Sequence, residues 1–574
     1  MSARLLARWV EAHGGSAALA RWAAALAMAE ASGHTALDLA RARAEDPALD
    51  PAALEAPGWV GTGALRTPFV REGEQRLYLW RHWQAEARVA AALAARAREP
   101  DTGPLAPEAV EALFGGPGDG RDAAQREAVR RCGEARLFVL TGGPGTGKTT
   151  TVLRMLLARQ RQLGYPPRVR VAAPTGKAAQ RLVEAMREGR AGLASTLAGS
   201  AWETALAGFT LPEASTLHRL LGYQPARHRY ARDARDPIEA DLVVVDEASM
   251  LDLAQLDALL EALPPATPLW LVGDAEQLSP VGPGSALQDL VQALEARPGA
   301  PLVRLRHSFR ADRQLAALNA AIASGDAGAS LAALDASPAL ALRPLAGPAA
   351  LEAALRDWAR RLAVDLKSPP LPAEPAAARE AARTALAGLR QRQWLCATRE
   401  GPRGSQAVAA RLDTLLRRAL AGGSAAEAGP HYPGRPLIIT RNDPDSGLFN
   451  GDVGLCLPGA DGRLRAWFDT QDGPRAFPLG ALPAHAPACA LTVHKSQGSE
   501  YGAVAVLLPE DPQHPLLSRE LLYTAASRAR HALTLHASEA VLRAGVGRPV
   551  QRSGGLFERI GAALDGMGGG RARA

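Results

Sequence analysis

The sequence predicts an α/β protein of several domains, and three observations support this prediction. The chain has 574 residues, more than the roughly 250 to 300 residues at which a single hydrophobic core stops growing. From residue 120 to residue 300, short apolar runs alternate with helical segments, which is typical of a parallel sheet with helices on both faces. The same alternation returns after residue 488, so a second sheet of this class is expected.

The N-terminal region, residues 1–115, is rich in Ala, Leu and Arg and has the apolar spacing of amphipathic helices. Proline and glycine interrupt this pattern between Pro51 and Pro68, and a glycine-rich break follows at Phe114–Arg121. We therefore expect a small, mainly helical domain here.

Two α/β domains are expected after it. Residues 116–300 form the first, and its predicted strands are Leu137–Thr141, Val169–Ala173, Leu242–Asp246 and Leu269–Gly273. Residues 301–430 and 488–565 form the second. Between its two parts, residues 431–487 consist of short strand-like runs separated by glycine, which predicts a small β-barrel insertion. Residues 566–574, rich in Gly and Arg, are expected to be disordered.

Composition narrows the function classes. The formal net charge of +7 fits a polyanionic partner, although an ordinary solvated surface explains it equally well. The four cysteines form no C-x-x-C pair, which argues against a zinc site or an iron–sulfur cluster. No apolar run approaches the about 18 residues that a membrane span needs. We therefore expect a soluble, cytoplasmic protein that does not enter a membrane.

Lysine is rare in this chain, so each one is informative. Only four of the 66 basic residues are lysine. A lysine that persists among so many arginines indicates a position that needs a compact ammonium group. The four are Lys148, Lys177, Lys367 and Lys495.

A phosphate-binding loop follows the first predicted strand of the α/β region. The strand runs into G-x-x-x-x-G-K-T, the P-loop pattern in its required context. Backbone N–H groups of such a loop wrap phosphates at a helix N-terminus. Lys148 would reach the β- and γ-phosphates, and the Thr149 hydroxyl would ligate Mg²⁺. ATP and Mg²⁺ are thus the expected cofactors. The predicted nucleotide-binding residues of the loop are Gly142, Gly143, Pro144, Gly145, Thr146, Gly147, Lys148, Thr149 and Thr150.

Other candidate groups lie at strand ends or upstream of the loop. Asp246 would hold Mg²⁺ and Glu247 would orient and deprotonate the attacking water. Alone, such an acid pair more often opens a helix, but its place after a P-loop favours catalysis. Gln277, after the strand Leu269–Gly273, is positioned to sense the γ-phosphate. Gln125 either hydrogen-bonds the adenine edge or is an ordinary surface glutamine.

Hydrolysis also needs positive charge on the transferred phosphoryl group, which arginines from elsewhere in the chain can supply. Two candidates are Arg310, in the segment Leu305–Arg310, and Arg528, in the segment Tyr523–Arg530. Charge alone does not separate them from the many other arginines, and their motif settings favour them.

The order of these motifs along the chain resembles superfamily-1 helicases, and within them the RecD type, the alpha subunit of exodeoxyribonuclease V. The resemblance covers residues 120 to 535. Two N-terminal segments, Gly33–Leu37 and Arg76–Trp83, are also similar to the short RecD subunit. Besides the P-loop, the segments that carry it are Ala173–Ala179, Ala214–Leu220, Gly273–Leu278, Pro433–Asn442, Leu448–Gly454 and Thr492–Glu500.

The resemblance implies two RecA-like motor domains with ATP in the cleft between them, so that Lys148 and Glu247 face Arg310 and Arg528. It also implies an SH3-like form for the β-barrel insertion. It further implies 5′ to 3′ movement on single-stranded DNA and action on duplex DNA ends in recombination repair. The expected partners are the beta and gamma subunits of a heterotrimer, in the bacterial cytoplasm near the nucleoid.

A motor on single-stranded DNA needs sequence-independent contacts from hydroxyl, ammonium and helix N-terminal groups. A stretch rich in arginine, residues 228–235, matches the family's small hairpin near 222–237 that helps part the duplex, and a solvated loop is an equal alternative. The predicted DNA-binding residues are Thr175, Lys177, His218, Thr492, His494, Lys495 and Ser496.

Three alternatives to a motor subunit fit the sequence less well. A metal-dependent nuclease needs clustered acids with a nearby lysine, and only Asp365–Lys367 has that spacing, so nuclease activity is expected in another subunit. A self-standing helicase of this type carries a longer N-terminal region with helix-hairpin-helix DNA-binding elements. The N-terminal region of this chain shows no clear element of that kind, so this alternative is disfavoured. A structural subunit with a lost ATPase is disfavoured because Lys148, Asp246 and Glu247 are intact.

Overall fold

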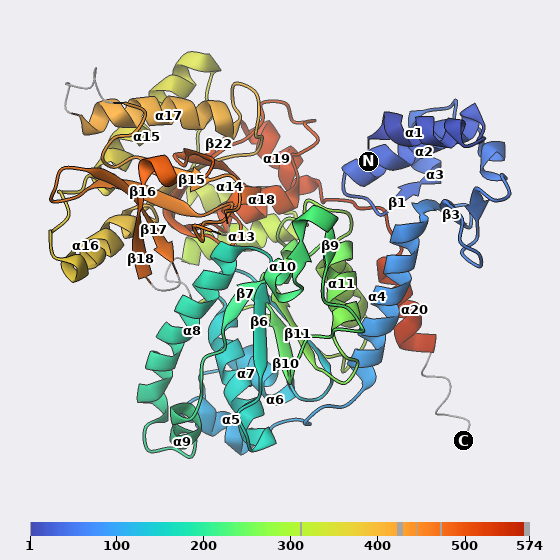
Figure 1. Cartoon of the computed structure of the whole chain (residues 1–574), viewed down its shortest axis with the longest axis horizontal. Helices are drawn as coiled ribbons and strands as arrows, with labels where there is room; N and C mark the ends of the chain where they lie inside the picture. The colour runs from blue at the N-terminus through green and yellow to red at the C-terminus, as the bar shows by residue number, and fades with distance from the viewer. Residues whose placement is uncertain (1, 310–312, 422–428, 444, 471–472, 567–574) are drawn as a thin grey trace.

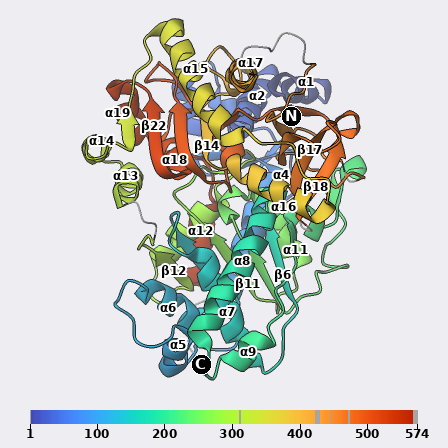
Figure 2. The same cartoon turned by 90° about the vertical axis from the view of Figure 1, so that its left-hand side faces the viewer.

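The computed structural model describes residues 2–309, 313–421, 429–443, 445–470 and 473–566. Two parallel sheets with helices on their faces lie one above the other, and an antiparallel sheet and an N-terminal domain flank them (Figures 1 and 2). Among the described helices, none combines the length and the apolar character that crossing a membrane requires.

The N-terminal domain contains helices and a small sheet. The helices α1 (Ala3–Ala12) and α2 (Ala17–Ala31) each begin after a serine whose side chain caps the first turn. The prediction of a mainly helical domain is not confirmed, because the domain also contains a four-stranded sheet with the order β1-β4-β3-β2. Its strands have only two to four residues, too few for a clear alternating pattern. They are β1 (Ala36–Asp38), β2 (Val60–Gly61), β3 (Phe69–Glu72) and β4 (Arg76–Leu79).

The first parallel sheet has six strands in the order β12-β5-β11-β10-β6-β7. Its four central strands are the apolar runs that the sequence predicts. The edge strand β12 pairs with β5, so this sheet extends beyond the predicted domain boundary at residue 300. The strands are β5 (Leu137–Gly142), β6 (Val169–Ala173), β7 (Ala214–Thr216), β10 (Leu242–Val245), β11 (Leu269–Gly273) and β12 (Leu302–Leu305).

Helices bury both faces of this sheet, which explains why its central strands β5, β10 and β11 are almost entirely apolar and buried. On one face, side chains of α6, α7 and α8 pack on Phe138 and Trp270. On the other, side chains of α4, α11 and α12 pack on Val139 and Leu271. The helices are α4 (Trp80–Arg98), α6 (Ala123–Arg131), α7 (Lys148–Leu163), α8 (Gly176–Leu197), α11 (Leu253–Ala262) and α12 (Ala286–Glu295).

The second parallel sheet has five strands in the order β13-β22-β21-β14-β20. The strands are β13 (Leu340–Leu342), β14 (Arg392–Cys396), β20 (Ala490–Thr492), β21 (Tyr501–Leu507) and β22 (Ala529–His536). One core includes α13 (Arg313–Ser324), α14 (Ala327–Asp335), α18 (Arg519–Ala526) and α19 (Glu539–Gly547), and the other includes α15 (Gly347–Leu366), α16 (Pro375–Gly388) and α17 (Ser405–Leu420).

The insertion between the two parts of this domain is a five-stranded antiparallel sheet with the order β18-β17-β16-β15-β19. Within the described part of the chain, no pairing joins the outer strands β18 and β19, so the predicted closed barrel is not confirmed. The strands are β15 (Pro436–Ile439), β16 (Val453–Pro458), β17 (Leu464–Thr470), β18 (Gly473–Pro478) and β19 (His485–Pro487).

The last helix, α20 (Leu556–Gly566), leaves the second domain and returns to the first. Figure 1 shows it beside α4, and Leu556 and Ile560 lie in the core that α4, α11 and α12 share. The prediction that the second domain continues to residue 565 is therefore wrong for this helix. The predicted tail, 566–574, lies almost entirely outside the described residues.

Candidate active site

The P-loop joins the end of β5 to the start of α7, and its backbone requires glycine. Gly145 has φ +71° and Gly147 has φ +80°, a conformation that side chains disfavour. A Cβ atom on Gly147 would lie 2.4 Å from Gln125 Nε2. Lys148 Nζ donates to the carbonyl oxygens of Gly142 at 2.6 Å and Gly143 at 3.1 Å. The ammonium group is thus held over the loop.

Two neighbouring segments support this loop. The buried side chain of Gln125, from α6, donates its amide hydrogen to the Thr146 carbonyl at 2.9 Å. The Phe309 backbone N–H donates to the Gly145 carbonyl at 2.9 Å. The Gln125 amide thus contacts the loop itself, and its buried side chain does not fit the alternative of an ordinary surface glutamine. The contact with the adenine edge stays a prediction. Arg310 lies outside the described residues.

The predicted acid pair lies at the carboxyl end of β10. Glu247 has φ +51°, a strained conformation for a residue with a side chain. The Glu247 N–H donates to the Asp246 carboxylate at 2.9 Å. Burial, together with the adjacent Glu247 charge, raises the pKa of Asp246 to about 6, while Lys148 and Arg181 oppose this rise.

The donor set fits Mg²⁺. The described residues contain no group of three or more His, Cys, Asp or Glu side chains that could hold a metal. Mg²⁺ bound with a nucleotide usually takes only one or two protein ligands, because phosphate oxygens and water supply the rest. Asp246 and the Thr149 hydroxyl would offer two hard oxygen ligands. A cation there would also offset the charge repulsion between Asp246 and Glu247.

A hydrogen-bonded group joins the two parallel sheets. Asp274, at the end of β11, accepts from Gln277 Nε2 at 3.1 Å and from the Tyr523 hydroxyl at 2.9 Å. Tyr523 belongs to α18, which packs on the second sheet. Its hydroxyl lies close to the P-loop, because a Cβ atom added to Gly143 would be 2.9 Å from it. Burial and the Asp274 carboxylate raise the pKa of Tyr523. Gln277 is therefore positioned by both domains.

Two arginines make contacts near the junction of the domains that the sequence alone does not reveal. Arg528 is buried and donates to the carbonyls of Thr524 at 3.0 Å and Ser499 at 3.1 Å, so it is packed within the second domain. Arg181, in α8, was not singled out from the sequence. It donates to the Gly498 carbonyl and lies 3.8 Å from the Glu500 carboxylate. It therefore links the first domain to the second beside Glu247, whose charge acts on it.

The cleft between the domains is large and rich in arginine. Its volume is about 1220 Å³, which exceeds the roughly 300 to 1,000 Å³ typical of small-molecule sites. The volume is thus sufficient for a nucleoside triphosphate. The side chains and backbone that line it include Arg121, Gly142, Gly143, Pro144, Thr146, Asp274, Arg304, Arg306, His307, Asn319, Tyr523 and Arg530.

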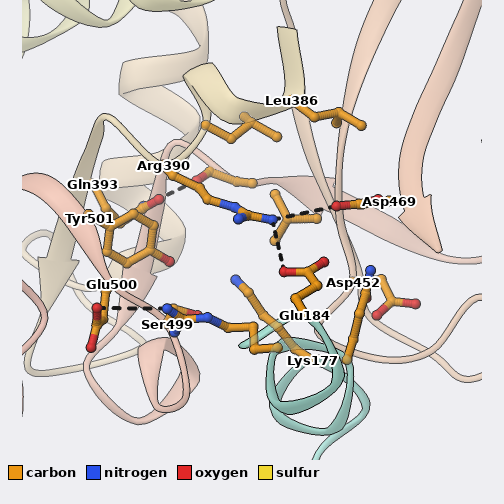
Figure 3. Close-up of a pocket in the computed structure, with 15 residues that line it drawn as sticks. Lys177, Glu184, Leu386, Arg390, Gln393, Asp452, Asp469, Ser499, Glu500 and Tyr501 are labelled. Atoms are coloured by element: carbon orange, nitrogen blue, oxygen red, sulfur yellow. Dashed lines mark hydrogen bonds and ion pairs between the residues drawn. The ribbon is translucent and has the colours of Figure 1, made fainter. Parts of the chain in front are cut away.

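A second, smaller pocket of about 90 Å³ lies where α8, α16 and the antiparallel sheet meet (Figure 3). Arg390 lies 3.7 Å from the Glu184 carboxylate and 3.5 Å from the Asp469 carboxylate. The Lys177 ammonium lies 6.0 Å from the centre of the Tyr501 ring. Lys177 is thus half-buried at a junction of three parts of the chain.

The other predicted DNA-binding residues lie in several environments. Thr175 caps α8, its hydroxyl accepting the Ala178 N–H at 3.2 Å. Thr492 accepts the Lys495 N–H at 3.2 Å, and Lys495 is exposed. Burial, followed by the charge of Arg552, lowers the pKa of His494.

Ser496 does not fit the predicted role. Its side chain is fully buried, and its hydroxyl donates to the Val493 carbonyl at 2.7 Å. A DNA strand cannot reach this hydroxyl in the present arrangement, so the prediction for Ser496 is corrected to a packing role. The sequence could not separate it from its exposed neighbour Lys495.

The arginine-rich stretch forms a short hairpin of β8 (Tyr223–Gln224) and β9 (Arg229–Tyr230). His218 packs against it, with its ring centre 5.1 Å from Tyr223 and 5.9 Å from Tyr230. The hairpin predicted near residues 222–237 is therefore present, and His218 supports its base.

Comparison with known proteins adds independent findings. Residues 125–283 match the AAA domain family, and residues 487–536 match the UvrD-like helicase C-terminal domain family. The RecBCD enzyme subunit RecD of Mycobacterium tuberculosis is 38% identical over 513 residues, covering 85% of this chain and 80% of that protein.

Two other relatives extend this likeness. The RecBCD enzyme subunit RecD of Haemophilus influenzae is 32% identical over 471 residues, covering 75% of this chain and 71% of that protein. The ATP-dependent RecD2 DNA helicase of Deinococcus radiodurans is 33% identical over 437 residues, covering 74% of this chain and 50% of that protein.

Proposed function

Since the chain belongs to the RecD family of superfamily-1 helicases, we propose that it is the ATP-driven 5′ to 3′ motor subunit of an exodeoxyribonuclease V complex. The chain is an ATP-dependent DNA helicase. Its proposed partners are the beta and gamma subunits, and its proposed substrates are duplex DNA ends and the single strands they release. It works in the bacterial cytoplasm, at the nucleoid, and nuclease activity belongs to another subunit.

The P-loop binds the triphosphate. Backbone N–H groups of the loop face the phosphates, and Lys148 neutralises charge on the β- and γ-phosphates. Thr149 and Asp246 would hold Mg²⁺, which would further neutralise the phosphate oxygens. Glu247 accepts the proton of the attacking water. Arg528, together with Arg310, stabilises the transferred phosphoryl group after the domains close.

The observation that carries this proposal is the hydrogen-bonded group of Asp274, Gln277 and Tyr523. It lies beside the P-loop yet includes a side chain from each domain. A change in charge at the γ-phosphate position alters the contacts of Gln277, and the second domain is held to the same group. Hydrolysis is thereby coupled to relative movement of the two domains.

Single-stranded DNA binds across both domains. Thr175 and Lys177 contact its phosphates from the first domain, and Thr492, His494 and Lys495 contact them from the second. The hairpin of β8 and β9 lies next to this path and parts the duplex. The antiparallel sheet, as an SH3-like element, borders the path near Lys177, where Asp452 and Asp469 line the same pocket.

The test is ATP hydrolysis by the purified full chain with and without single-stranded DNA, for wild type, Lys148→Gln and Lys367→Gln. We expect DNA-stimulated hydrolysis by wild type, its loss in Lys148→Gln and its retention in Lys367→Gln. Lys367 is an exposed lysine after α15 and therefore a matched control. Absence of DNA-stimulated hydrolysis in wild type, alone and with the beta and gamma subunits, would contradict the proposal.

A further inference from the structure

Three distant segments meet at one arginine, Arg552. The first is the turn Gly33–Ala36 of the N-terminal domain. The second is the loop Pro280–Gly284, which follows Gln277. The third is the strap, residues 548–555, which connects α19 to α20. Figure 1 shows α19 in the upper part of the molecule, with the second domain, and α20 lower down beside α4 of the first, so the strap crosses between the two domains.

The guanidinium group of Arg552 is fixed by backbone carbonyls of the loop. It donates to Gly282 at 2.6 Å and to Gly284 at 2.8 Å, and it also donates to Pro280. Burial lowers the pKa of Arg552, and the carboxylates of Asp289 and Asp252 oppose this effect. A planar fork of N–H donors suits three carbonyls in one loop better than a single ammonium group does.

The loop Pro280–Gly284 closely follows Gln277, the proposed γ-phosphate sensor, in the chain. The Leu278 N–H donates to the Thr524 hydroxyl at 2.8 Å, and the Leu278 carbonyl accepts from Gln497 at 3.2 Å. Leu278 is the next residue after Gln277. The segment from Gln277 to Gly284 is therefore held by the second domain at one end and by Arg552 at the other.

The N-terminal turn is shaped around the same group. The Gly284 N–H donates to the Gly33 carbonyl at 3.0 Å, and the Ser553 N–H donates to His34 Nδ1 at 2.8 Å. Gly33 has φ +88°, and a Cβ atom there would lie 2.7 Å from Arg552 Cζ. Only glycine leaves room for the guanidinium group, so this turn and Arg552 fit each other closely.

The strap is also hydrogen-bonded to the second domain, two residues before Arg552. The Val550 N–H donates to the Glu520 carboxylate of α18 at 2.8 Å. Only Gln551 separates this anchor from Arg552. An extended chain spans at most about 3.3 to 3.6 Å per residue, so the two domains stay close together at this point.

We propose that Arg552 is a positioning residue for ATP hydrolysis: it fixes the loop that follows Gln277 and ties its position to the N-terminal domain. This inference rests on the proposed function. Arg552 does not touch the nucleotide site itself but acts through the loop and Gln277.

The experiment compares wild type, Arg552→Ala, Arg552→Lys and Arg548→Ala as full chains. Arg548 is the matched control, because it also donates to backbone carbonyls, those of Pro512, His514 and Leu517, but all of them lie in the second domain. Basal and DNA-stimulated kcat, ATP KM, nucleotide Kd and thermal unfolding are measured, and kcat is expressed per nucleotide-binding molecule.

We expect Arg552→Ala to lower kcat roughly ten- to a hundredfold, because a small misplacement of a catalytic group has effects of this size. ATP KM and nucleotide Kd stay within about twofold of wild type. Arg552→Lys loses less, and Arg548→Ala stays within about twofold of wild type.

Two results would overturn the inference. The first is an unchanged kcat per nucleotide-binding molecule in both Arg552→Ala and Arg552→Lys. Any lower total activity of these variants would then come from loss of folded protein alone. The other is an equal loss in Arg548→Ala. If wild type hydrolyses ATP without stimulation by DNA, the proposed function fails, and basal kcat still decides the role of Arg552.

Discussion

The Tyr523 hydroxyl donates to the Asp274 carboxylate at 2.9 Å and so joins a helix of the second domain to a strand end of the first. Gln277 donates to the same carboxylate oxygen. The three residues form a buried bridge beside the P-loop. Its integrity should matter for coupling between the domains more than for nucleotide binding.

Tyr523→Phe tests this bridge. The change removes one hydrogen bond and no ring packing, so we expect a stability loss of about 0.5 to 1.5 kcal/mol. ATP hydrolysis stimulated by DNA should fall several-fold while nucleotide Kd stays near the wild-type value. Steady-state kinetics and fluorescent-nucleotide titration check this, and an unchanged DNA-stimulated rate would show that the bridge is only structural.

Gly147→Ala tests the shape of the P-loop. The new methyl group meets Gln125 Nε2 and imposes a side chain at φ +80°. Gly164→Ala is the matched control, because Gly164 follows the end of the same helix at φ +75°, and a Cβ atom there would meet no other part of the described chain within 4 Å. Both variants should lose about 1 kcal/mol of stability from backbone strain. Only Gly147→Ala should lose nucleotide binding, and equal affinities would contradict this account.

Asp246→Asn tests the buried acid pair through pH. A pKa raised to about 6 in the folded state means that the contribution of Asp246 to stability is fully present below its ordinary pKa of 3.8 and is lost as pH rises through about 6. The nucleotide-free variant lacks this loss and should be more stable than wild type at pH 8, by at most about 3 kcal/mol. The advantage should shrink toward pH 5. Denaturant unfolding at both pH values measures it, and a difference that does not change with pH would argue against a buried, unpaired charge.

Lys177→Gln tests the first-domain contact with DNA. Loss of one phosphate contact should lower the slope of log affinity against log salt by about 0.7 for single-stranded DNA. Lys367→Gln should leave the slope unchanged. Fluorescence anisotropy over a salt series measures both. Identical slopes for the two variants would show that Lys177 does not contact a DNA phosphate. Its place beside the Tyr501 ring would then be structural.

The sequence was most informative where function depends on adjacent residues. The P-loop and the pair Asp246–Glu247 are local patterns, and the strands that carry them are apolar because helices cover both faces of the sheet. The positions of Arg181, Tyr523 and Arg552 depend on contacts between residues far apart in the chain. No local pattern encodes such contacts, so these residues were not singled out.

Two fold features were missed for similar reasons. The edge strand β12 follows a loop after α12, and only its pairing with β5 assigns it to the first sheet. The apolar face of α20 could pack on either domain as far as its sequence shows. Its packing against α4 assigns it to the first domain. The corrected role of Ser496 likewise depends on burial, which neighbouring letters do not reveal.

The most direct test of the central claim is ATP-dependent unwinding by the full chain, alone and with the beta and gamma subunits, of duplexes that carry either a 5′ or a 3′ single-stranded overhang. The account predicts unwinding of the 5′-overhang duplex by wild type and none by Glu247→Gln. Unwinding of the 3′-overhang duplex alone would contradict the direction. Unwinding of neither duplex, with or without the partner subunits, would contradict the claim that this chain is a DNA motor.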